Sequence, residues 1–191
     1  GVFCAQPALL LVCLAADDAY WPALACAKDP RIQLAPGGSE RADSVLNGLH
    51  SLGRLGAEGQ DWVLVHDAAR PNLSRQDLDL LLAELASDAV GGLLAVPSRD
   101  TLKRVRPDGR VLETLDRSHI WQAFTPQMFR FEHLQQALRD ALGSGAVVTD
   151  EASAIELTGQ APRLIEGRAD NLKITRPEDL DWLREHWAQQ H

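Results

Sequence analysis

Short apolar segments alternate along the chain with stretches in which apolar residues recur every three or four positions. The segments at 10–14, 62–65 and 91–96 contain almost no polar residues, which is typical of strands buried on both faces of a sheet. The periodic stretch at 40–52, and a second one that follows Ser74, predict amphipathic helices. This alternation predicts an α/β fold with a mostly parallel sheet covered by helices on both faces.

The second half of the chain continues the alternation in shorter units. Helical periodicity recurs near 132–142 and 151–157. Pro177 suits the first turn of a final helix, which the residues from Thr175 onward would cap. We expect short strands at 147–148, 163–165 and 172–174.

The segment at 101–116 departs from this pattern. Two polar arms flank the sequence Pro-Asp-Gly-Arg at 107–110, whose Asp-Gly pair is a hairpin signal. The arms carry too many charges for central strands, so they predict a β-hairpin that projects from the α/β body. Because an isolated hairpin is only marginally stable in water, we expect it to pack on another surface, such as a second subunit. The chain would then be one domain over 1–191 with a β-arm at about 100–117.

The composition excludes several classes of partner. The chain has 191 residues, of which 45% are hydrophobic and 24% charged, and its formal net charge is −8. These values are typical of a globular domain. An acidic chain argues against general binding to nucleic acids or anionic membranes, but it leaves room for a small phosphorylated ligand.

The cysteines and the apolar runs bear on the compartment. The three cysteines are odd in number and have no C-x-x-C spacing, so we predict no zinc site or disulfide framework, and a cytoplasmic setting fits. The longest apolar run, at 8–16, has nine residues and is too short to span a bilayer. No Lys or Arg precedes Lys28, so the cationic start of a signal peptide is missing.

Motifs of several common enzyme classes are missing from the sequence. It contains no G-x-G-x-x-G, no G-x-x-x-x-G-K-[ST], no H-E-x-x-H and no G-x-S-x-G. Dehydrogenases, P-loop NTPases, zinc hydrolases and α/β-hydrolases therefore have little support.

Candidate chemistry begins directly after the predicted strand at 62–65. Ligands of open α/β sheets bind beyond the carboxyl ends of the strands, and an acid placed there, Asp67, can reach a Mg²⁺ ion together with phosphate oxygens. Arg70 can grip a phosphate through two nitrogens, and Ala68 leaves room for a ligand beside the backbone. In the structural alternative, Asp67 caps the turn and Arg70 lies on the surface.

Three further segments each have a functional and a structural interpretation. The glycines at 37–38 precede a helix, where N–H groups can bind an anion or a nucleotide, or where Ser39 simply caps the helix. Lys173 lies between Leu and Ile, and it points into a polar site or reaches the surface. Thr149 opens a helix start that capping alone explains.

Seven motifs, taken in order, resemble one known family. They are GGSERADSV, VHDAARP, RDTLKR, LDRS, TPQMF, TDEAS and EGRADNLKITRPEDL. Each is weak alone, but their order over residues 10–182 is similar to that of the 2-C-methyl-D-erythritol 4-phosphate cytidylyltransferases of the non-mevalonate isoprenoid pathway. The resemblance implies a Rossmann-like nucleotidyltransferase domain whose β-arm locks a homodimer. It also implies a Mg²⁺-dependent reaction of CTP with 2-C-methyl-D-erythritol 4-phosphate, which gives 4-diphosphocytidyl-2-C-methyl-D-erythritol and pyrophosphate.

The matching motifs also imply roles for individual residues. The catalytic residues would be Lys173, Asp67 and Arg117. Lys173 would lie near the reacting phosphates, and Asp67 would lie between the nucleotide, the metal ion and the substrate. The cytidine site would contain Gly38, Ser39, Ser44, Asp67 and Ala68. The substrate would be contacted by Asp67, Arg70, Thr125 and Thr149. Thr101 and Arg117 lie on the arm, which would carry them to the substrate of the other subunit.

The N-terminus departs from the family. Its members begin with a strand and a glycine-rich loop that carries an Arg and, further on, a Lys in a Pro-Lys-Gln motif, and these wrap the triphosphate. Nothing before Leu10 matches, the segment 10–14 resembles the family's second strand, and residues 1–6 resemble remnants of the preceding helix. We therefore expect the sequence to lack this segment, and we expect little or no catalysis from a chain without the loop.

Two other functions remain open. A cytidylyltransferase for another polyol phosphate, such as ribitol 5-phosphate, would have the same sheet and cytidine loop. A catalytically silent module that binds a nucleotide or a sugar phosphate would account for the missing loop. Neither nucleic acid nor a membrane is an expected partner.

Overall fold

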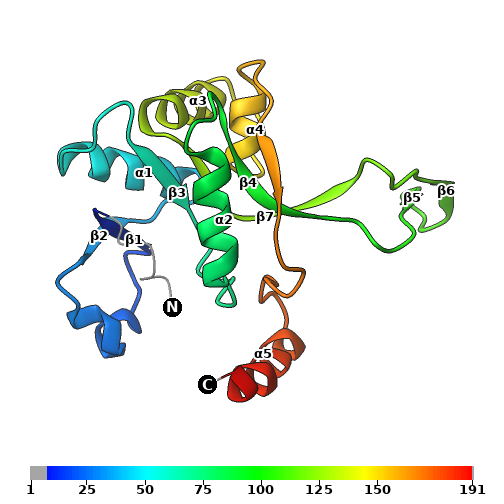
Figure 1. Ribbon diagram of the computed structural model, residues 1–191, viewed down its shortest axis with the longest axis horizontal. Coiled ribbons are helices and arrows are strands. Elements are labelled where there is room, and N and C mark those ends of the chain that lie inside the picture. Colours follow the sequence, from blue (N-terminus) through cyan, green and yellow to red (C-terminus); the bar gives the residue numbers. More distant parts are fainter. Residues whose placement is uncertain (1–7, 191) are drawn as a thin grey trace.

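The computed structural model describes residues 8–190, with side chains up to residue 185 (Figure 1). Residues 1–6, interpreted above as remnants of a helix, lie outside the described residues. Within residues 8–190, no helix is both long and apolar enough to cross a membrane.

The body is built on a four-stranded sheet in the order β3-β7-β4-β8. The strands are β3 (Trp62–Val65), β7 (Trp121–Arg130), β4 (Gly91–Pro97) and β8 (Arg163–Glu166). β7 is antiparallel to both of its neighbours, whereas β4 and β8 are parallel. Three strands therefore run in one direction, and their carboxyl ends share one edge of the sheet. The predicted α/β class is confirmed, and the sheet is mixed because β7 runs the other way between β3 and β4.

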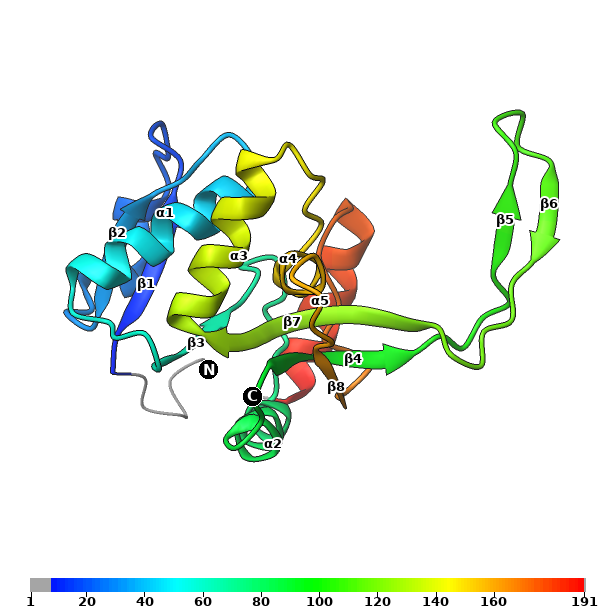
Figure 2. The ribbon, with the colours of Figure 1, turned by 90° about the horizontal axis from the view of Figure 1, so that it is seen from above.

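Helices cover both faces of this sheet, as the alternation predicted (Figure 2). The helices α1 (Arg41–Arg54), α3 (Phe131–Gly143) and α4 (Glu151–Glu156) pack on one face, and α2 (Arg75–Leu85) packs on the other. Leu93 and Leu94, adjacent on β4, belong to the cores on opposite faces. This arrangement explains the continuous apolar run of β4, since both faces of the strand are buried.

The N-terminal part forms a second, two-stranded sheet. Here β1 (Leu10–Leu14) pairs in parallel with β2 (Ile32–Pro36). Two short 3-10 helices, Trp21–Ala23 and Ala25–Lys28, connect the strands. Helix α1 packs on this sheet, and the approach is close at Gly48, where an added Cβ would lie 3.0 Å from Cys13 Sγ. Helix α1 therefore joins the small sheet to the body.

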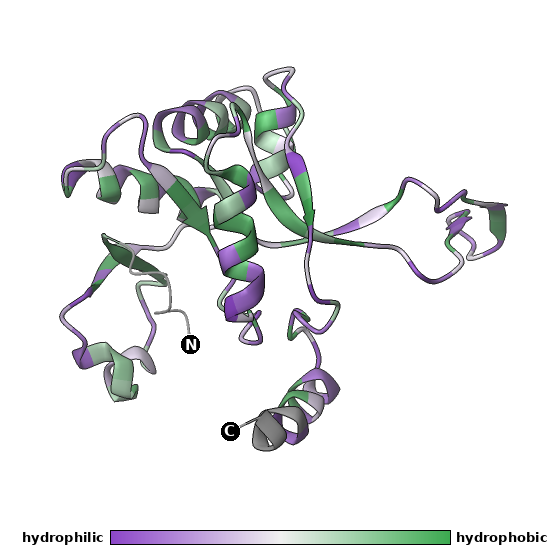
Figure 3. Cartoon of the chain, viewed as in Figure 1, coloured by the Kyte–Doolittle hydropathy of each residue, from purple (hydrophilic) through white to green (hydrophobic). Residues whose placement is uncertain are grey.

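A hairpin lies within the range predicted for the arm, and it projects from the body (Figures 1 and 2). It consists of β5 (Lys103–Val105) and β6 (Val111–Thr114), which pair antiparallel. The turn places Gly109 at φ 81°, in the left-handed region that favours glycine. Figure 3 shows hydrophilic residues over much of the arm and a hydrophobic patch at β6, where Val111 and Leu112 are each more than half exposed.

The structure corrects four expectations about individual elements. The predicted strands at 147–148 and 172–174 are irregular segments, and Val147 is 85% exposed. The strands β2 and β7 were missed, because their sequences mix polar residues and prolines with apolar ones. The final helix α5 (Pro177–Gln190) begins where expected, although Asp179 accepts the capping bonds from the backbone of Thr175 and Arg176.

Candidate functional site

The site forms at the sheet edge where β3 and β8 end, and its centre is an ion pair between two predicted residues. Asp67 follows the end of β3, and Lys173 lies in the irregular segment after β8. Lys173 Nζ lies 2.9 Å from Asp67 Oδ2. Lys173 is partly exposed, as its surface alternative expects, and its ammonium group also pairs with a carboxylate that is mostly buried.

Arg41, the first residue of α1, extends this ion pair into a network of four charges. Its Nε donates to Asp67 Oδ1 at 2.8 Å. Its two terminal nitrogens donate to the carboxylate of Glu151, in the first turn of α4, at 2.6 and 2.9 Å. Glu151 is completely buried. The charges alternate in sign along the network, so a low-dielectric site holds two acids and two bases without a net charge.

The pKa shifts in the network follow from burial and from these partners. Burial raises the pKa of the Asp67 carboxyl, but the hydrogen bond from Lys173 and the charge of Arg41 outweigh it, so the pKa lies below its ordinary value. Burial also raises the pKa of Glu151, and Arg41 offsets this only in part. Burial lowers the pKa of Arg41, but its bonds to Glu151 outweigh that effect and raise it overall.

Arg70 lies beside the network with most of its guanidinium buried. It donates to the backbone carbonyls of Asn171 at 2.8 Å and Ala123 at 3.4 Å, and it stacks over the Phe124 ring at 4.6 Å. Its Nε is buried and has no hydrogen-bond partner among the described residues. The predicted surface alternative for Arg70 is wrong, because only 9% of the residue is exposed.

Thr125 and His66 fix the backbone that carries Asp67. The Asp67 N–H donates to Thr125 Oγ1 at 3.0 Å, and Thr125 Oγ1 lies 2.9 Å from His66 Nδ1. His66 Nε2 lies 2.9 Å from the Arg70 carbonyl, which can only accept, so Nε2 carries the proton and Nδ1 accepts from the Thr125 hydroxyl. Burial lowers the pKa of His66, which favours this neutral ring.

The predicted cytidine loop lies at the N-terminus of α1. The Gly38 N–H donates to Ser44 Oγ at 2.9 Å, and Ser39 Oγ donates to Asp43 at 2.6 Å. An added Cβ on Gly38 would lie 2.2 Å from the Cβ of Asp43, so only glycine fits. The carboxylate of Asp43 accepts the Glu40 N–H and closes a capping box. Arg41 leads from this loop directly to Asp67, beside which Ala68 is exposed.

Comparison with known proteins identifies the family. The family model described as 2-C-methyl-D-erythritol 4-phosphate cytidylyltransferase matches residues 3–185. A protein with this name from Pseudomonas fluorescens strain SBW25 is 70% identical over 190 residues, which cover 98% of this chain and 81% of the relative. The chain belongs to the 2-C-methyl-D-erythritol 4-phosphate cytidylyltransferase family.

Solved structures of cytidylyltransferases agree with the observed fold. A crystal structure of a 4-diphosphocytidyl-2C-methyl-D-erythritol synthase superposes with a TM-score of 0.85 at 41% identity, over 94% of this chain and 82% of that one. The 2-C-methyl-D-erythritol 4-phosphate cytidylyltransferase of Francisella tularensis gives a TM-score of 0.82 at 34% identity, over 93% and 79% of the two chains. The Rossmann-like nucleotidyltransferase fold implied by the motifs is therefore confirmed.

The remaining predicted site residues of this cytidylyltransferase lie outside the charge network. Arg117 donates to the backbone carbonyl of Arg99 at the base of the arm, and Thr101 is exposed nearby. Thr149 is exposed just before α4, where its N–H donates to Ser153 Oγ at 3.1 Å. The structure thus gathers Asp67, Lys173, Arg70 and Thr125, with the predicted cytidine loop beside them. It leaves Thr149 and the two arm residues apart.

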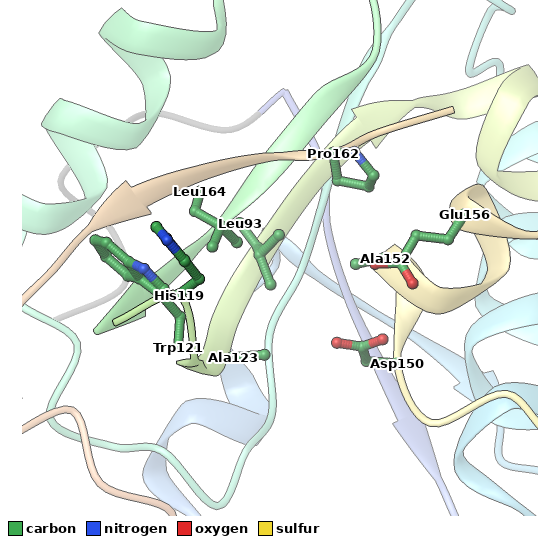
Figure 4. Close-up of a pocket in the computed structure, with 9 residues that line it drawn as sticks. All are labelled: Leu93, His119, Trp121, Ala123, Asp150, Ala152, Glu156, Pro162 and Leu164. Carbon is green, nitrogen blue, oxygen red and sulfur yellow. The ribbon is translucent and has the colours of Figure 1, made fainter. Parts of the chain in front are cut away.

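A pocket of about 230 Å³ lies between α4 and the strands β4, β7 and β8 (Figure 4). In Figure 4, Asp150 and Glu156 lie on one side of it and His119 and Trp121 on the other. The lining residues are Leu93, His119, Trp121, Ala123, Asp150, Ala152, Glu156, Pro162 and Leu164. One of them, Ala123, accepts a hydrogen bond from Arg70 through its backbone carbonyl.

Sequence reasoning missed four residues that build the site: Arg41, His66, Glu151 and Asn171. Arg41 did leave a signal, because the helix dipole disfavours a cation in a first turn unless an acid stands near it. Glu151 was predicted only as the beginning of the helix at 151–157. Asn171 is 1% exposed, and its amide donates to the Thr125 carbonyl at 2.9 Å, but a short polar segment gave no hint of that contact.

Proposed function

We propose that this protein transfers the cytidylyl group of CTP to 2-C-methyl-D-erythritol 4-phosphate, giving 4-diphosphocytidyl-2-C-methyl-D-erythritol and pyrophosphate. The observation that carries the proposal is the Asp67–Lys173 ion pair beside the glycine loop of α1, in a chain that belongs to this family. An acid and a movable cation at one sheet edge suit a reaction between two phosphate-bearing molecules.

The reaction needs no nucleophile from the protein. An oxygen of the substrate phosphate forms a bond to the α-phosphorus of CTP while the bond from that phosphorus to the bridging oxygen breaks, and pyrophosphate leaves with the electron pair. A phosphate monoester is largely ionised near pH 7, so no strong base is required. What the site must supply is alignment and positive charge, and Lys173 supplies charge because its half-exposed ammonium can move from Asp67 toward the phosphates.

Asp67 is the residue that fits a Mg²⁺ ion. No three His, Cys, Asp or Glu side chains gather as a metal site within the described part of the chain. Mg²⁺, however, commonly uses one or two carboxylates and completes its shell with substrate phosphates and waters. The Asp67 carboxylate has about four lone-pair sites, and its ion pairs use one on each oxygen. When bound there, Mg²⁺ would neutralise charge on the phosphates.

The other predicted residues have supporting roles in this proposal. Arg70, with a free Nε facing a buried environment, would contact the substrate, and Thr125 and Thr149 would contact substrate or phosphate oxygens. Gly38, Ser39, Ser44 and Ala68 would hold cytidine. The exposed apolar residues of the arm support a homodimer, in which Thr101 and Arg117 would reach the substrate of the other subunit. The unpaired thiols of Cys13 and Cys26 are compatible with the cytoplasm.

Replacing Lys173 by Ala tests the chemistry. In the full-length enzyme, Lys173→Ala should lower kcat by on the order of 10²–10³, because one charge-stabilising group is lost from the transition state. Pyrophosphate release measures the rate, and thermal unfolding checks that the variant folds. Lys28→Ala, at an exposed position in a 3-10 helix, is the matched control and should keep the full rate. An unchanged kcat in Lys173→Ala would remove Lys173 from the reaction.

The choice of substrate separates the proposal from its alternatives. Pyrophosphate release from CTP should require 2-C-methyl-D-erythritol 4-phosphate. A faster reaction with ribitol 5-phosphate would favour the other polyol cytidylyltransferase. Binding of CTP without any release by the full-length protein would favour a silent binding module.

A further inference from the structure

Glu151 is a buried charge that the proposed chemistry does not use. The residue is completely buried in the first turn of α4, and both of its carboxylate oxygens accept hydrogen bonds from Arg41. A buried ion pair of this kind adds little stability compared with an apolar pair of similar size, since desolvation offsets the attraction. The pair is therefore better explained by what it holds in place.

The position of Glu151 is set by the sheet. The buried side chain of Gln127, on β7, donates to Asp150 Oδ2 at 2.9 Å and accepts the Ala152 N–H at 2.8 Å. Asp150 also caps α4 through the Ser153 N–H at 2.9 Å. Gln127 thus binds the residues on both sides of Glu151. The position of the Glu151 carboxylate is therefore fixed relative to the sheet.

Arg41 transmits that fixed position to Asp67. A guanidinium is planar, so its two bonds to Glu151 also fix where its Nε points. That Nε lies 2.8 Å from Asp67 Oδ1, while Asp67 Oδ2 faces Lys173 at 2.9 Å. Without Glu151, the terminal nitrogens of Arg41 would be free to turn to the nearest remaining carboxylate, which is that of Asp67.

We infer that Glu151 is a positioning residue, which holds Arg41 so that Arg41 contacts only one oxygen of Asp67 and leaves the other for Lys173 or a metal ion. The inference rests on the proposed function and adds Glu151 and Arg41 to its site. In this inference, the position of Asp67 at the end of β3 depends on a chain of contacts that starts at β7 and runs through α4 and α1.

Glu151→Gln tests this role, because it keeps the size of the side chain and removes its charge. In the full-length enzyme we expect kcat to fall by about 10- to 100-fold, as is typical when a residue that orients a ligand is changed. The Mg²⁺ concentration for half-maximal rate should rise, because Arg41 would then bind both oxygens of Asp67 and compete with the metal ion for them. Glu132→Gln makes the same change at an exposed position in the first turn of α3 and should leave both quantities as in the parent enzyme.

A second readout follows Arg41 directly and does not depend on turnover. The Nε–H of Arg41, bonded at a mostly buried site, should give a slowly exchanging NMR signal that is identified by its loss in Arg41→Lys. The signal should be lost or shifted in Glu151→Gln and kept in Glu132→Gln. Should Glu151→Gln fail to fold, the double variant Arg41→Met/Glu151→Met removes both charges together. It should fold and keep the Mg²⁺ requirement of the parent enzyme, because no guanidinium is left to compete for Asp67; a raised requirement would contradict the inference.

Two further results would overturn the inference. One is a Glu151→Gln enzyme with the parent's kcat and Mg²⁺ dependence, whatever its stability. The other is an unchanged Arg41 signal in that variant. If the parent enzyme itself gives no turnover with CTP and 2-C-methyl-D-erythritol 4-phosphate, the proposed function fails, and the Arg41 signal alone then decides whether Glu151 orients Arg41.

Discussion

Asp88 shows how a single side chain shapes the entry to the central sheet. Its carboxylate accepts the N–H groups of Val90 and Gly91, both at 2.8 Å, just where β4 begins. Gly91 has φ 106°, and an added Cβ would lie 2.3 Å from the Met128 carbonyl, so no other residue fits there. The hydrogen bonds from Gly91 and Val90 lower the pKa of Asp88 below its ordinary value of 3.8.

This shift predicts a pH dependence of stability. The folded state binds the Asp88 proton less tightly than the unfolded state, so the carboxylate stabilises the fold above pH 3.8, and the contribution is lost as the pH falls through the lowered pKa. Asp88→Asn should cost about 1 kcal/mol of unfolding free energy at pH 7 and less at pH 3. Urea unfolding at the two pH values measures the difference. Asp17→Asn, at an exposed position, should show neither effect, and a constant cost for Asp88→Asn would contradict the prediction.

At the same scale, the sequence was sufficient for some site residues and not for others. Asp67 and Arg70 could be predicted because they directly follow a strand whose carboxyl end faces ligands in this class of fold. Lys173 was singled out by its apolar neighbours. The pair of Arg41 and Glu151 could not be predicted, because residues 110 positions apart meet only after the sheet has assembled.

Among the elements, those with a clear period or a continuous apolar run were predicted, and those with mixed sequences were not. β4 was predicted from its continuous apolar run, and α1 was predicted because its apolar residues recur every three or four positions. β7 contains Gln127 and a cis Thr125–Pro126 bond, and its polar side chains serve α4 and the site rather than the core. A residue selected for such contacts disturbs the pattern on which strand prediction depends.

The arm is the element whose exposed surface calls for a partner. Val105, Val111 and Leu112 are 54%, 57% and 51% exposed on a hairpin that makes few contacts with the body. Leu112→Asp should weaken the proposed homodimer at least 10-fold in Kd, because a charge would be buried at the contact. Sedimentation over a range of concentrations measures this. Leu55→Asp, with a similar exposure of 52% at the end of α1, should leave the dimer intact. A dimer of unchanged affinity in Leu112→Asp would show that the arm lies outside the interface.

At the scale of the whole molecule, the first turns of two helices and the segments after two strands contribute to one site. The small sheet is joined to the body through α1, and the first residue of α1 is Arg41. α4 adds Glu151, which lies 110 positions after Arg41, and the segment after β8 adds Lys173. The site therefore exists only when the body is folded, and a ligand that binds it should stabilise the whole molecule.

Ligand binding should thus be visible as thermal stabilisation. CTP with Mg²⁺ should raise the Tm of the full-length protein, with about 2.7 kcal/mol of stabilisation at a CTP concentration 100 times its Kd. Adding EDTA should remove most of the shift, and so should Asp67→Asn, since Asp67 is the proposed metal ligand. A full shift in EDTA would mean that the nucleotide binds without help from the metal ion at Asp67.

The balance of the four-charge network has one more consequence. Because the charges of Asp67, Glu151, Arg41 and Lys173 sum to zero, the network itself attracts a distant anion only weakly, and an approaching CTP meets the field of a molecule whose net charge is −8. That distant repulsion is screened within about 8 Å in physiological salt. The net charge of the molecule thus repels the nucleotide weakly at a distance. The site attracts it only at close range, when Lys173 leaves the carboxylate of Asp67 and pairs with a phosphate.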